Sequence, residues 1–306
     1  MTFRLAHVSD THVLSPEGVH WRELFFNKRI TGWANTRLRR GRVYRRRYLE
    51  AVLDEASTAD HVVVTGDVTN LALEGEYAEA RRLLASRAGR AEITVVPGNH
   101  DLYLPSIRRE GRFERHFAPF VRSDLPDLGV DVDAGRYPFV KLRGPAAIIG
   151  LSSAVPRPPF VSAGRLGWRQ LRALEAILTR PEVRDRFPVI LVHHPPVYSR
   201  GRWRGRLHEL RDGLVDAASL REVLAPLPRG LVLFGHLHVR FRCRLGALDA
   251  VCASGAALDH SDETIRAGYN SYTLGQSGLT GIEARVLDSS GASLRRVEIS
   301  ERRGRP

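Results

Sequence analysis

Residues 93–101 read Ile-Thr-Val-Val-Pro-Gly-Asn-His-Asp, an apolar run followed directly by polar side chains. Its β-branched run predicts a buried strand at 93–96, which a Pro-Gly pair ends in a tight loop. The loop then carries an amide, an imidazole and a carboxylate at Asn99, His100 and Asp101. Loops at the carboxyl ends of strands are where α/β sheets commonly hold a functional site. Taken alone, the stretch fits an Asn/Asp turn with a chance histidine equally well.

Four other predicted strands are followed by side chains of the same kinds. These strands are 3–8, 61–65, 189–192 and 231–234. The polar groups that follow them are, in the same order, Asp10 and His12; Asp67; His193 and His194; and His236 and His238. A single Gly-Asp or His-x-His is common without any function. Five such groups at five strand ends are expected to converge on one edge of a sheet, and their donor atoms are those that bind divalent transition metals.

Predicted helices alternate with these strands. Helical spacing of apolar residues occurs at 48–57, 74–85, 166–178 and 216–224, and a further strand is predicted at 146–151. This alternation predicts a largely parallel sheet with right-handed crossovers. Residues 102–145 look less regular, and the short alternating segments after Val239 predict antiparallel strands.

The composition suits a globular protein of 306 residues, 43% of them apolar. No apolar run approaches the length of a membrane span, and a strand beginning at Phe3 leaves no room for a signal peptide. We therefore expect a cytoplasmic protein. Cys243 and Cys252 are too few for a disulfide framework. They could face each other across a hairpin that turns near 246–248, but two reduced thiols in the core are the expectation for a cytoplasm.

Positive charge is concentrated in one segment of the chain. The formal net charge is +13, and between Trp21 and Tyr48 ten basic residues accompany one acid, Glu23. Large apolar residues are interleaved with them, as in Phe-Phe-Asn-Lys-Arg-Ile-Thr-Gly-Trp at 25–33. This basic-aromatic insertion, defined as residues 13–48, is not explained by a diffuse solvated face.

The five groups resemble the calcineurin-like metallophosphoesterase family. They occur in the family's order, namely Asp-x-His, Gly-Asp, Gly-Asn-His-Asp, His-x-Pro and Gly-His-x-His. The resemblance implies an α/β fold, a four-layer α/β/β/α sandwich of two mixed sheets flanked by helices. It also implies one domain over 1–300 that includes the insertion, followed by a flexible tail at 301–306.

The resemblance further implies a dinuclear metal centre with manganese, iron or zinc, the metal identity being left open. The first metal would take Asp10, His12 and His238, the second Asn99, His193 and His236, and Asp67 would bridge both. His193 is preferred to His194 because it lies two residues before a proline and because adjacent strand-end side chains point to opposite faces. No ligand position is substituted, which argues against a non-catalytic metal-binding scaffold.

Two further residues receive catalytic roles from this resemblance. His100 would protonate the leaving oxygen or hold a phosphoryl oxygen. Asp101 would orient His100 or support a neighbouring ligand, as carboxylates next to a metal site do.

The substrate is left open among several classes. The insertion could lie at an anionic membrane surface, grip a nucleic-acid backbone, or pack as a helical cap. It is similar to a segment of bacterial metallophosphoesterases related to enzymes that cleave the pyrophosphate of UDP-diacylglucosamine. This favours a phosphodiester or pyrophosphate, in a lipid-linked nucleotide at the inner face of the membrane. The residues that would contact membrane or substrate are Phe26, Lys28, Arg29 and Trp33.

The main alternative is a soluble 3′,5′-cyclic nucleotide phosphodiesterase, and a nuclease is the next. The partners expected are therefore a small-molecule or lipid-linked phosphate ester and an anionic membrane surface, with nucleic acid left open and no obligate protein partner evident. Because the predicted ligands lie outside the insertion, the chemistry is expected to survive without it.

Overall fold

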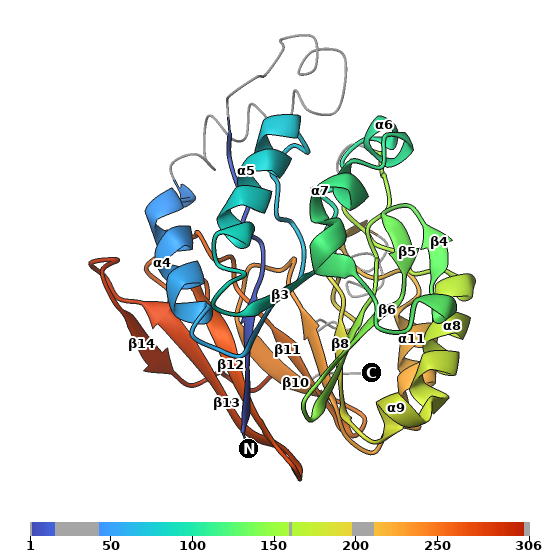
Figure 1. Ribbon diagram of the computed structural model, residues 1–306. Helices are drawn as coiled ribbons and strands as arrows, with labels where there is room; N and C mark the ends of the chain where they lie inside the picture. Colours follow the sequence, from blue (N-terminus) through green and yellow to red (C-terminus); the bar gives the residue numbers. More distant parts are fainter. Residues whose placement is uncertain (1, 16–42, 159–160, 198–210, 303–306) are drawn as a thin grey trace.

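The protein is a sandwich of two mixed sheets with helices on both outer sides (Figure 1). The computed structural model describes residues 2–15, 43–158, 161–197 and 211–302. The four-layer architecture expected from the sequence is confirmed. None of the helices in these four ranges has the length and apolar character needed to cross a bilayer.

The first sheet has a parallel half and an antiparallel half. In spatial order its strands are β14 (Leu294–Val297), β13 (Gly278–Leu287), β12 (Gly268–Gly275), β1 (Phe3–Val8), β2 (His61–Val64) and β3 (Glu92–Val95). β1, β2 and β3 are parallel, whereas β12, β13 and β14 join by antiparallel pairing. The carboxyl ends of β1, β2 and β3 therefore lie at one edge, as expected.

The second sheet has a parallel centre with an antiparallel strand at each edge. In spatial order its strands are β10 (Phe241–Leu245), β11 (Leu248–Cys252), β9 (Leu231–Phe234), β8 (Phe187–Leu191), β7 (Ala146–Gly150) and β6 (Phe139–Arg143). β6 and β10 are the antiparallel strands. A small separate hairpin consists of β4 (Val130–Val132) and β5 (Gly135–Tyr137).

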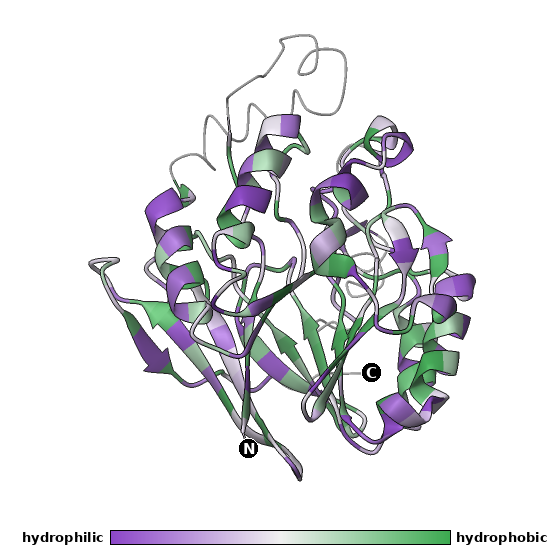
Figure 2. Cartoon of the chain, in the orientation of Figure 1, coloured by the Kyte–Doolittle hydropathy of each residue, from purple (hydrophilic) through white to green (hydrophobic). Residues whose placement is uncertain are grey.

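Seven helices of the described residues cover the two sheets. α4 (Arg46–Ala56), α5 (Glu74–Ala85) and α7 (Arg112–Val121) pack on the first sheet. α8 (Trp168–Thr179), α9 (Pro181–Arg184) and α11 (Ala217–Leu224) pack on the second. The short α6 (Pro105–Arg109) precedes α7. The buried strands and the apolar faces of these helices are the green parts of Figure 2, and the outer helix faces are largely purple.

Alternating side chains of the second sheet serve two different cores. Val189 and Leu191 of β8 belong to the core shared with the first sheet, whereas Ile190 between them belongs to the core under α8 and α11. Because both faces of β8 are buried, its sequence is a continuous apolar run rather than an alternating one. Because both faces of β8 are packed, the strand and the residues at its carboxyl end are held in place.

The stretch 102–145 has more regular structure than its sequence indicates. The stretch contains α6, α7, the β4–β5 hairpin and β6. Phe113, Phe117 and Phe120 of α7 are buried at helical spacing, but Pro119 within the helix and the Pro/Asp/Gly-rich sequence after it obscured this pattern.

The predicted hairpin around 246–248 is confirmed as β10–β11. Its register places Cys243 opposite Ala250 and Phe241 opposite Cys252, so the two cysteines do not face each other directly. Both thiols are buried and free, as expected. Of the predicted tail, Glu301 forms an isolated bridge with Arg242, and 303–306 lie outside the described residues.

A partly buried ion pair joins the two sheets where their edge strands β3 and β6 meet. Lys141 Nζ lies 3.2 Å from Glu92 Oε1 and 3.1 Å from the Ile93 carbonyl oxygen. Arg143 donates to the same carboxylate, with Nη2 2.7 Å from Oε1. The Lys141 side chain is only 3% exposed, so its charge depends on this partner.

Replacing Glu92 by Gln should destabilise the protein, because it leaves the buried ammonium of Lys141 without its carboxylate. We expect the free energy of unfolding to fall by about 2 kcal/mol, less than the roughly 3–5 kcal/mol of a fully buried pair, since Glu92 is partly exposed. Urea unfolding at pH 7 measures the change. Adding Lys141→Met should recover part of it, and a double variant no more stable than Glu92→Gln would contradict the pairing.

The same pair predicts a dependence of stability on pH. The hydrogen bond from Arg143 lowers the pKa of Glu92 from 4.5 to about 2. A lowered pKa means that the stabilisation is present above about pH 4.5 and is lost as the pH falls toward 2. The difference in free energy of unfolding between wild type and Glu92→Gln should therefore become smaller as the pH falls from about 4.5 toward 2.

Candidate metal centre

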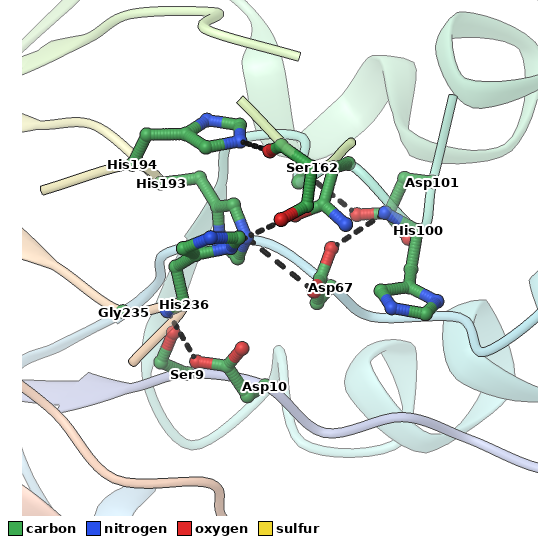
Figure 3. A network of polar contacts seen from close by, with 12 residues as sticks. Ser9, Asp10, Asp67, His100, Asp101, Ser162, His193, His194, Gly235 and His236 are labelled. Atoms are coloured by element: carbon green, nitrogen blue, oxygen red, sulfur yellow. Dashed lines mark hydrogen bonds and ion pairs between the residues drawn. The ribbon is translucent and has the colours of Figure 1, made fainter. Parts of the chain in front are cut away.

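The ends of β1, β2, β3, β8 and β9 bring all seven predicted metal ligands together at one edge of the sandwich. Figure 3 shows the rings of His193 and His236 side by side next to Asp67, with Asp10 below them. The convergence predicted from five separate strand ends is therefore what the structure has. Phe26, Lys28, Arg29 and Trp33, the predicted membrane or substrate contacts, lie outside the described residues.

The backbone at these ligands is strained. Six non-glycine residues among those described have positive φ, and five of them are predicted ligands: Asp10 (50°), His12 (41°), Asp67 (50°), His236 (68°) and His238 (52°). This conformation costs roughly 1–2 kcal/mol for a residue with a Cβ atom. Positive φ at both ends of an Asp-x-His or His-x-His triplet turns the two side chains toward the same centre.

The first group of ligand atoms comes from β1 and β9. Asp10 Oδ1 lies 3.1 Å from His238 Nε2 and 3.9 Å from His12 Nε2. The two imidazole nitrogens are 3.3 Å apart. The other carboxylate oxygen, Asp10 Oδ2, accepts the backbone N–H of His236 at 3.0 Å, so Oδ1 is the atom turned to the centre.

The second group comes from β3, β8 and β9. His193 Nε2 lies 3.1 Å from Asn99 Oδ1 and 3.2 Å from His236 Nδ1. The tautomer of His193 follows from its other nitrogen, because Nδ1–H donates to the Thr65 carbonyl oxygen at 2.7 Å. In the neutral ring, Nε2 therefore offers its lone pair toward the centre.

Asp67 lies between the two groups. Its Oδ2 is 3.4 Å from His193 Nε2 and 3.9 Å from His12 Nε2. Its Oδ1 accepts the backbone N–H of His100 at 2.7 Å, which fixes the orientation of the carboxylate. One oxygen is thus fixed by the loop after β3, and the other faces both ligand groups.

The charges of the site favour a cation at its centre. Burial lowers the pKa of a histidine, yet the carboxylates of Asp67 and Asp10 outweigh burial and raise the pKa of His193 to about 9. Burial and the charge on His193 lower the pKa of His236 to about 4. His193 therefore carries a proton beside Asp67, whereas the neighbouring imidazole of His236 is neutral.

These residues fit two metal ions. Ligands about 2.0–2.2 Å from one ion lie roughly 3.0–3.5 Å from each other, the range of most spacings found here. Asp10 Oδ1 is fully buried and has no hydrogen-bond partner among the described residues, although it lies against two imidazole nitrogens. Burying a charged oxygen without a partner is unfavourable, so a cation bound at this position would stabilise it.

His194 lies beside the centre, and its hydrogen bonds distinguish it from a ligand. Its Nε2–H donates to the Ser162 carbonyl oxygen at 2.7 Å, and its Nδ1 lies 2.7 Å from Ser153 Oγ. A ring that donates from Nε2 must accept at Nδ1, so both nitrogens are engaged. A ring nitrogen of His194 lies within 4.8 Å of ligand atoms of His193 and His236, which makes His194 a geometric candidate, but its hydrogen bonds favour His193 as the ligand. His194 instead ties the loop after β7 to the site.

The hydrogen bonds described for Asp101 join it to neighbouring loops and not to the His100 ring. Its fully buried carboxylate accepts hydrogen bonds from the N–H groups of Gly98, Val68 and Thr69 and from the Thr69 hydroxyl. It thereby joins the loop after β2 to the loop after β3. These bonds hold the loops that carry Asp67 and Asn99, and the choice between the two roles expected for Asp101 stays a prediction.

Two glycines of the motifs are required by close approach. A Cβ atom at Gly235 would overlap Ser9 Oγ and Asp10 Oδ2, and one at Gly98 would overlap the side chain and amide of Asp67. The glycines in Gly-His-x-His and Gly-Asn-His-Asp therefore let the backbone of one loop lie against a carboxylate of another.

Gly235→Ala should reduce metal binding while the protein stays folded, because the added methyl group displaces Asp10. We expect at least a tenfold weaker affinity for Zn²⁺ or Mn²⁺, measured by competition with a chelator. Gly89→Ala is the matched control, since a Cβ atom there meets nothing within 4 Å. Equal affinity in the two variants would show that the close approach at Gly235 is not needed.

Comparison with known proteins agrees with this geometry. The family profile described as calcineurin-like phosphoesterase matches residues 3–240. The chain is 27% identical over 193 residues to the glycerophosphodiester phosphodiesterase GpdQ of Enterobacter lignolyticus (strain SCF1), which is 63% of this chain and 57% of that protein. It is 28% identical over 204 residues to the 3′,5′-cyclic adenosine monophosphate phosphodiesterase CpdA of Pseudomonas aeruginosa, which is 65% of this chain and 62% of that protein.

Both matches span less than two thirds of the relatives' own length. Among solved structures, the purple acid phosphatase PPD1 of yellow lupin superposes with a TM-score of 0.56 at 12% identity, over 99% of this chain and 54% of that one. At this identity the likeness concerns the fold. Since the family profile covers most of the sequence and all five motifs, the chain belongs to the calcineurin-like phosphoesterase family.

Proposed function

We propose that the protein hydrolyses a phosphate ester, most favourably a phosphodiester, with the help of two metal ions. Asp10, His12 and His238 would hold the first ion, and Asn99, His193 and His236 the second. The observation that carries this proposal is the position of Asp67, whose Oδ2 faces both groups at 3.4 and 3.9 Å. A shared carboxylate offsets the repulsion between two neighbouring cations.

Two bound ions would supply Lewis-acid activation of water and would stabilise the negative charge that develops on the phosphoryl oxygens. The mixture of imidazole, amide and carboxylate donors suits manganese, iron or zinc and leaves the choice among them open. The residues themselves hold this site in a fixed shape, because backbone or side-chain hydrogen bonds orient Asp10, Asp67, His193 and His238.

His100 is suited to move a proton. Its Nδ1–H donates to the Asn70 carbonyl oxygen at 2.6 Å, so Nε2 is the nitrogen that takes up or releases a proton. The ring is partly exposed, edge-on to His12 at 4.9 Å and stacked on Tyr103 at 5.5 Å. It thus lies beside the first ligand group, with part of the ring exposed. Its role is to protonate the leaving oxygen.

The names of the two curated relatives support a phosphodiester substrate over a phosphomonoester or phosphoprotein. One acts on a glycerophosphodiester and the other on a cyclic nucleotide, and both substrates contain a phosphodiester bond. The second relative favours the soluble cyclic nucleotide phosphodiesterase as the alternative function. A lipid-linked nucleotide at the inner face of the membrane stays a prediction, since it depends on Phe26, Lys28, Arg29 and Trp33.

A substrate panel with added manganese tests the proposed function. It compares a phosphomonoester, a phosphodiester, a cyclic nucleotide and a lipid-linked nucleotide pyrophosphate. We expect the phosphodiester or cyclic nucleotide to be turned over at least about tenfold faster than the monoester. Preference for the monoester would contradict the proposal. Salt-sensitive binding and cleavage of DNA or RNA would favour the nuclease instead.

Asp67→Asn is the decisive variant in this panel. The amide cannot offset two positive charges, so we expect metal content and turnover to fall together by a factor of 100 or more, on the order of the loss of a shared ligand. Elemental analysis gives the metal content, and circular dichroism checks the fold. Full activity with two metals still bound would remove Asp67 from its bridging role.

His100→Ala should lower the rate by roughly two to four orders of magnitude while the metal content stays unchanged. Substrates with good leaving groups need no proton and should lose least, so rates are compared for a nitrophenyl and an alkyl leaving group. Equal losses for both, or loss of metal, would contradict the role of proton donor.

A further inference from the structure

Tyr44 connects the end of the basic-aromatic insertion to the metal centre. It forms an isolated antiparallel bridge with Leu258. On either side, the Asp259 N–H donates to the Val43 carbonyl oxygen at 2.7 Å and the Arg45 N–H to that of Ala257 at 2.8 Å. These backbone bonds fix the position of Tyr44 just before α4, independently of its side chain.

The side chain of Tyr44 lies against two ligands of the first group. Its hydroxyl oxygen is 3.0 Å from His238 Nδ1, and its ring meets the His12 ring edge-on at 4.9 Å. His238 uses its other nitrogen, Nε2, to face Asp10 and His12. The ligand atoms of the first group face the centre of the site, and Tyr44 contacts the group from the opposite, outer side.

The hydrogen bond with Tyr44 matters because it can determine which tautomer His238 adopts. For His238 Nε2 to offer a lone pair to a cation, Nδ1 must carry the proton, and that proton needs an acceptor. Among the described residues, the phenol oxygen of Tyr44 lies in place to accept it. His193 achieves the same end with the Thr65 carbonyl oxygen, which no substitution can remove.

His238 also has less packing to hold it than its neighbours. Its side chain is 27% exposed, whereas the side chains of Asp10, His12 and His193 are fully buried. A partly exposed ring can rotate or exchange tautomers unless a hydrogen bond prevents it. Its orientation therefore depends more on one side-chain partner than that of the other ligands.

We propose that Tyr44 is a positioning residue for the first metal site. Its hydroxyl holds His238 in the Nδ1–H form, and its ring covers the His12 side of the site from water. This inference rests on the proposed function. It also changes the expectation that the insertion is separate from the chemistry, because Tyr44 belongs to residues 13–48 and contacts two predicted ligands.

Zn²⁺ binding by Tyr44→Phe tests the proposal, because this variant keeps the ring and removes only the hydroxyl. Titration against a chromogenic chelator should show that one of two Zn²⁺ ions binds about 10-fold to 100-fold more weakly, the usual effect of removing a ligand's hydrogen-bond partner. Nitrogen NMR of ¹⁵N-histidine protein should show His238 changing from a single Nδ1–H tautomer to a mixture.

Tyr269→Phe is the matched control. It also loses a tyrosine hydroxyl hydrogen bond, to Glu55 Oε1 at 3.3 Å, but it belongs to β12 and contacts none of the predicted ligands in the described structure. Its affinity for Zn²⁺ should equal that of the wild type. Tyr44→Leu, which removes the ring as well, should weaken binding further, and thermal unfolding of each metal-free variant checks that it remains folded.

The outcomes separate this proposal from the proposed function. If the wild type binds two Zn²⁺ ions and Tyr44→Phe binds both as tightly, with the His238 tautomer unchanged, the role of Tyr44 is overturned and the metal centre stands. If the wild type binds fewer than two ions, the dinuclear centre fails and the role of Tyr44 fails with it.

Discussion

The mutual repulsion of buried charges is the constraint on which this site depends. Asp10 and Asp67 are buried at the end of neighbouring parallel strands, and each lies within 4 Å of imidazole nitrogens. Two carboxylates in such a place need positive charge close by, and without metal the protein supplies it by holding a proton on His193. Metal ions can supply this positive charge at both ligand groups. The repulsion between the carboxylates, which destabilises the metal-free site, therefore favours metal binding.

The fold provides the rigidity that this arrangement requires. Positive φ at five ligand positions would relax into ordinary backbone if the strands could shift. They are held by burial on both sheet faces, by the Asp101 carboxylate between two loops, and by the Lys141–Glu92 pair where the sheets meet. The packing of the two sheets thus stabilises the strained backbone of the metal ligands at the edge of the sandwich.

Much of this could be predicted from the sequence because the signals are local. A strand followed at once by polar groups fixes where Asp10, Asp67 and Asn99 lie, since parallel strand ends share an edge. The proline spacing preferred His193 over His194, and the hydrogen bonds of both rings agree with that choice.

What the sequence did not reveal depends on contacts between distant residues. Tyr44 precedes its partner His238 by 194 positions, and nothing in its own segment indicates that it contacts a predicted ligand. The sequence left two roles open for Asp101, because it does not show which groups the carboxylate reaches. The fold places that carboxylate on the N–H and hydroxyl groups of Thr69, 32 positions away. The helix α7 was hidden by a proline that its last turn tolerates.

The most direct measurement is anomalous X-ray diffraction from a crystal of the wild-type protein soaked in Mn²⁺. The dinuclear account predicts two manganese peaks. One should lie among Asp10, His12 and His238, the other among Asn99, His193 and His236, and both should be next to Asp67 Oδ2. A single peak, or a peak coordinated by His194 in place of His193, would contradict it.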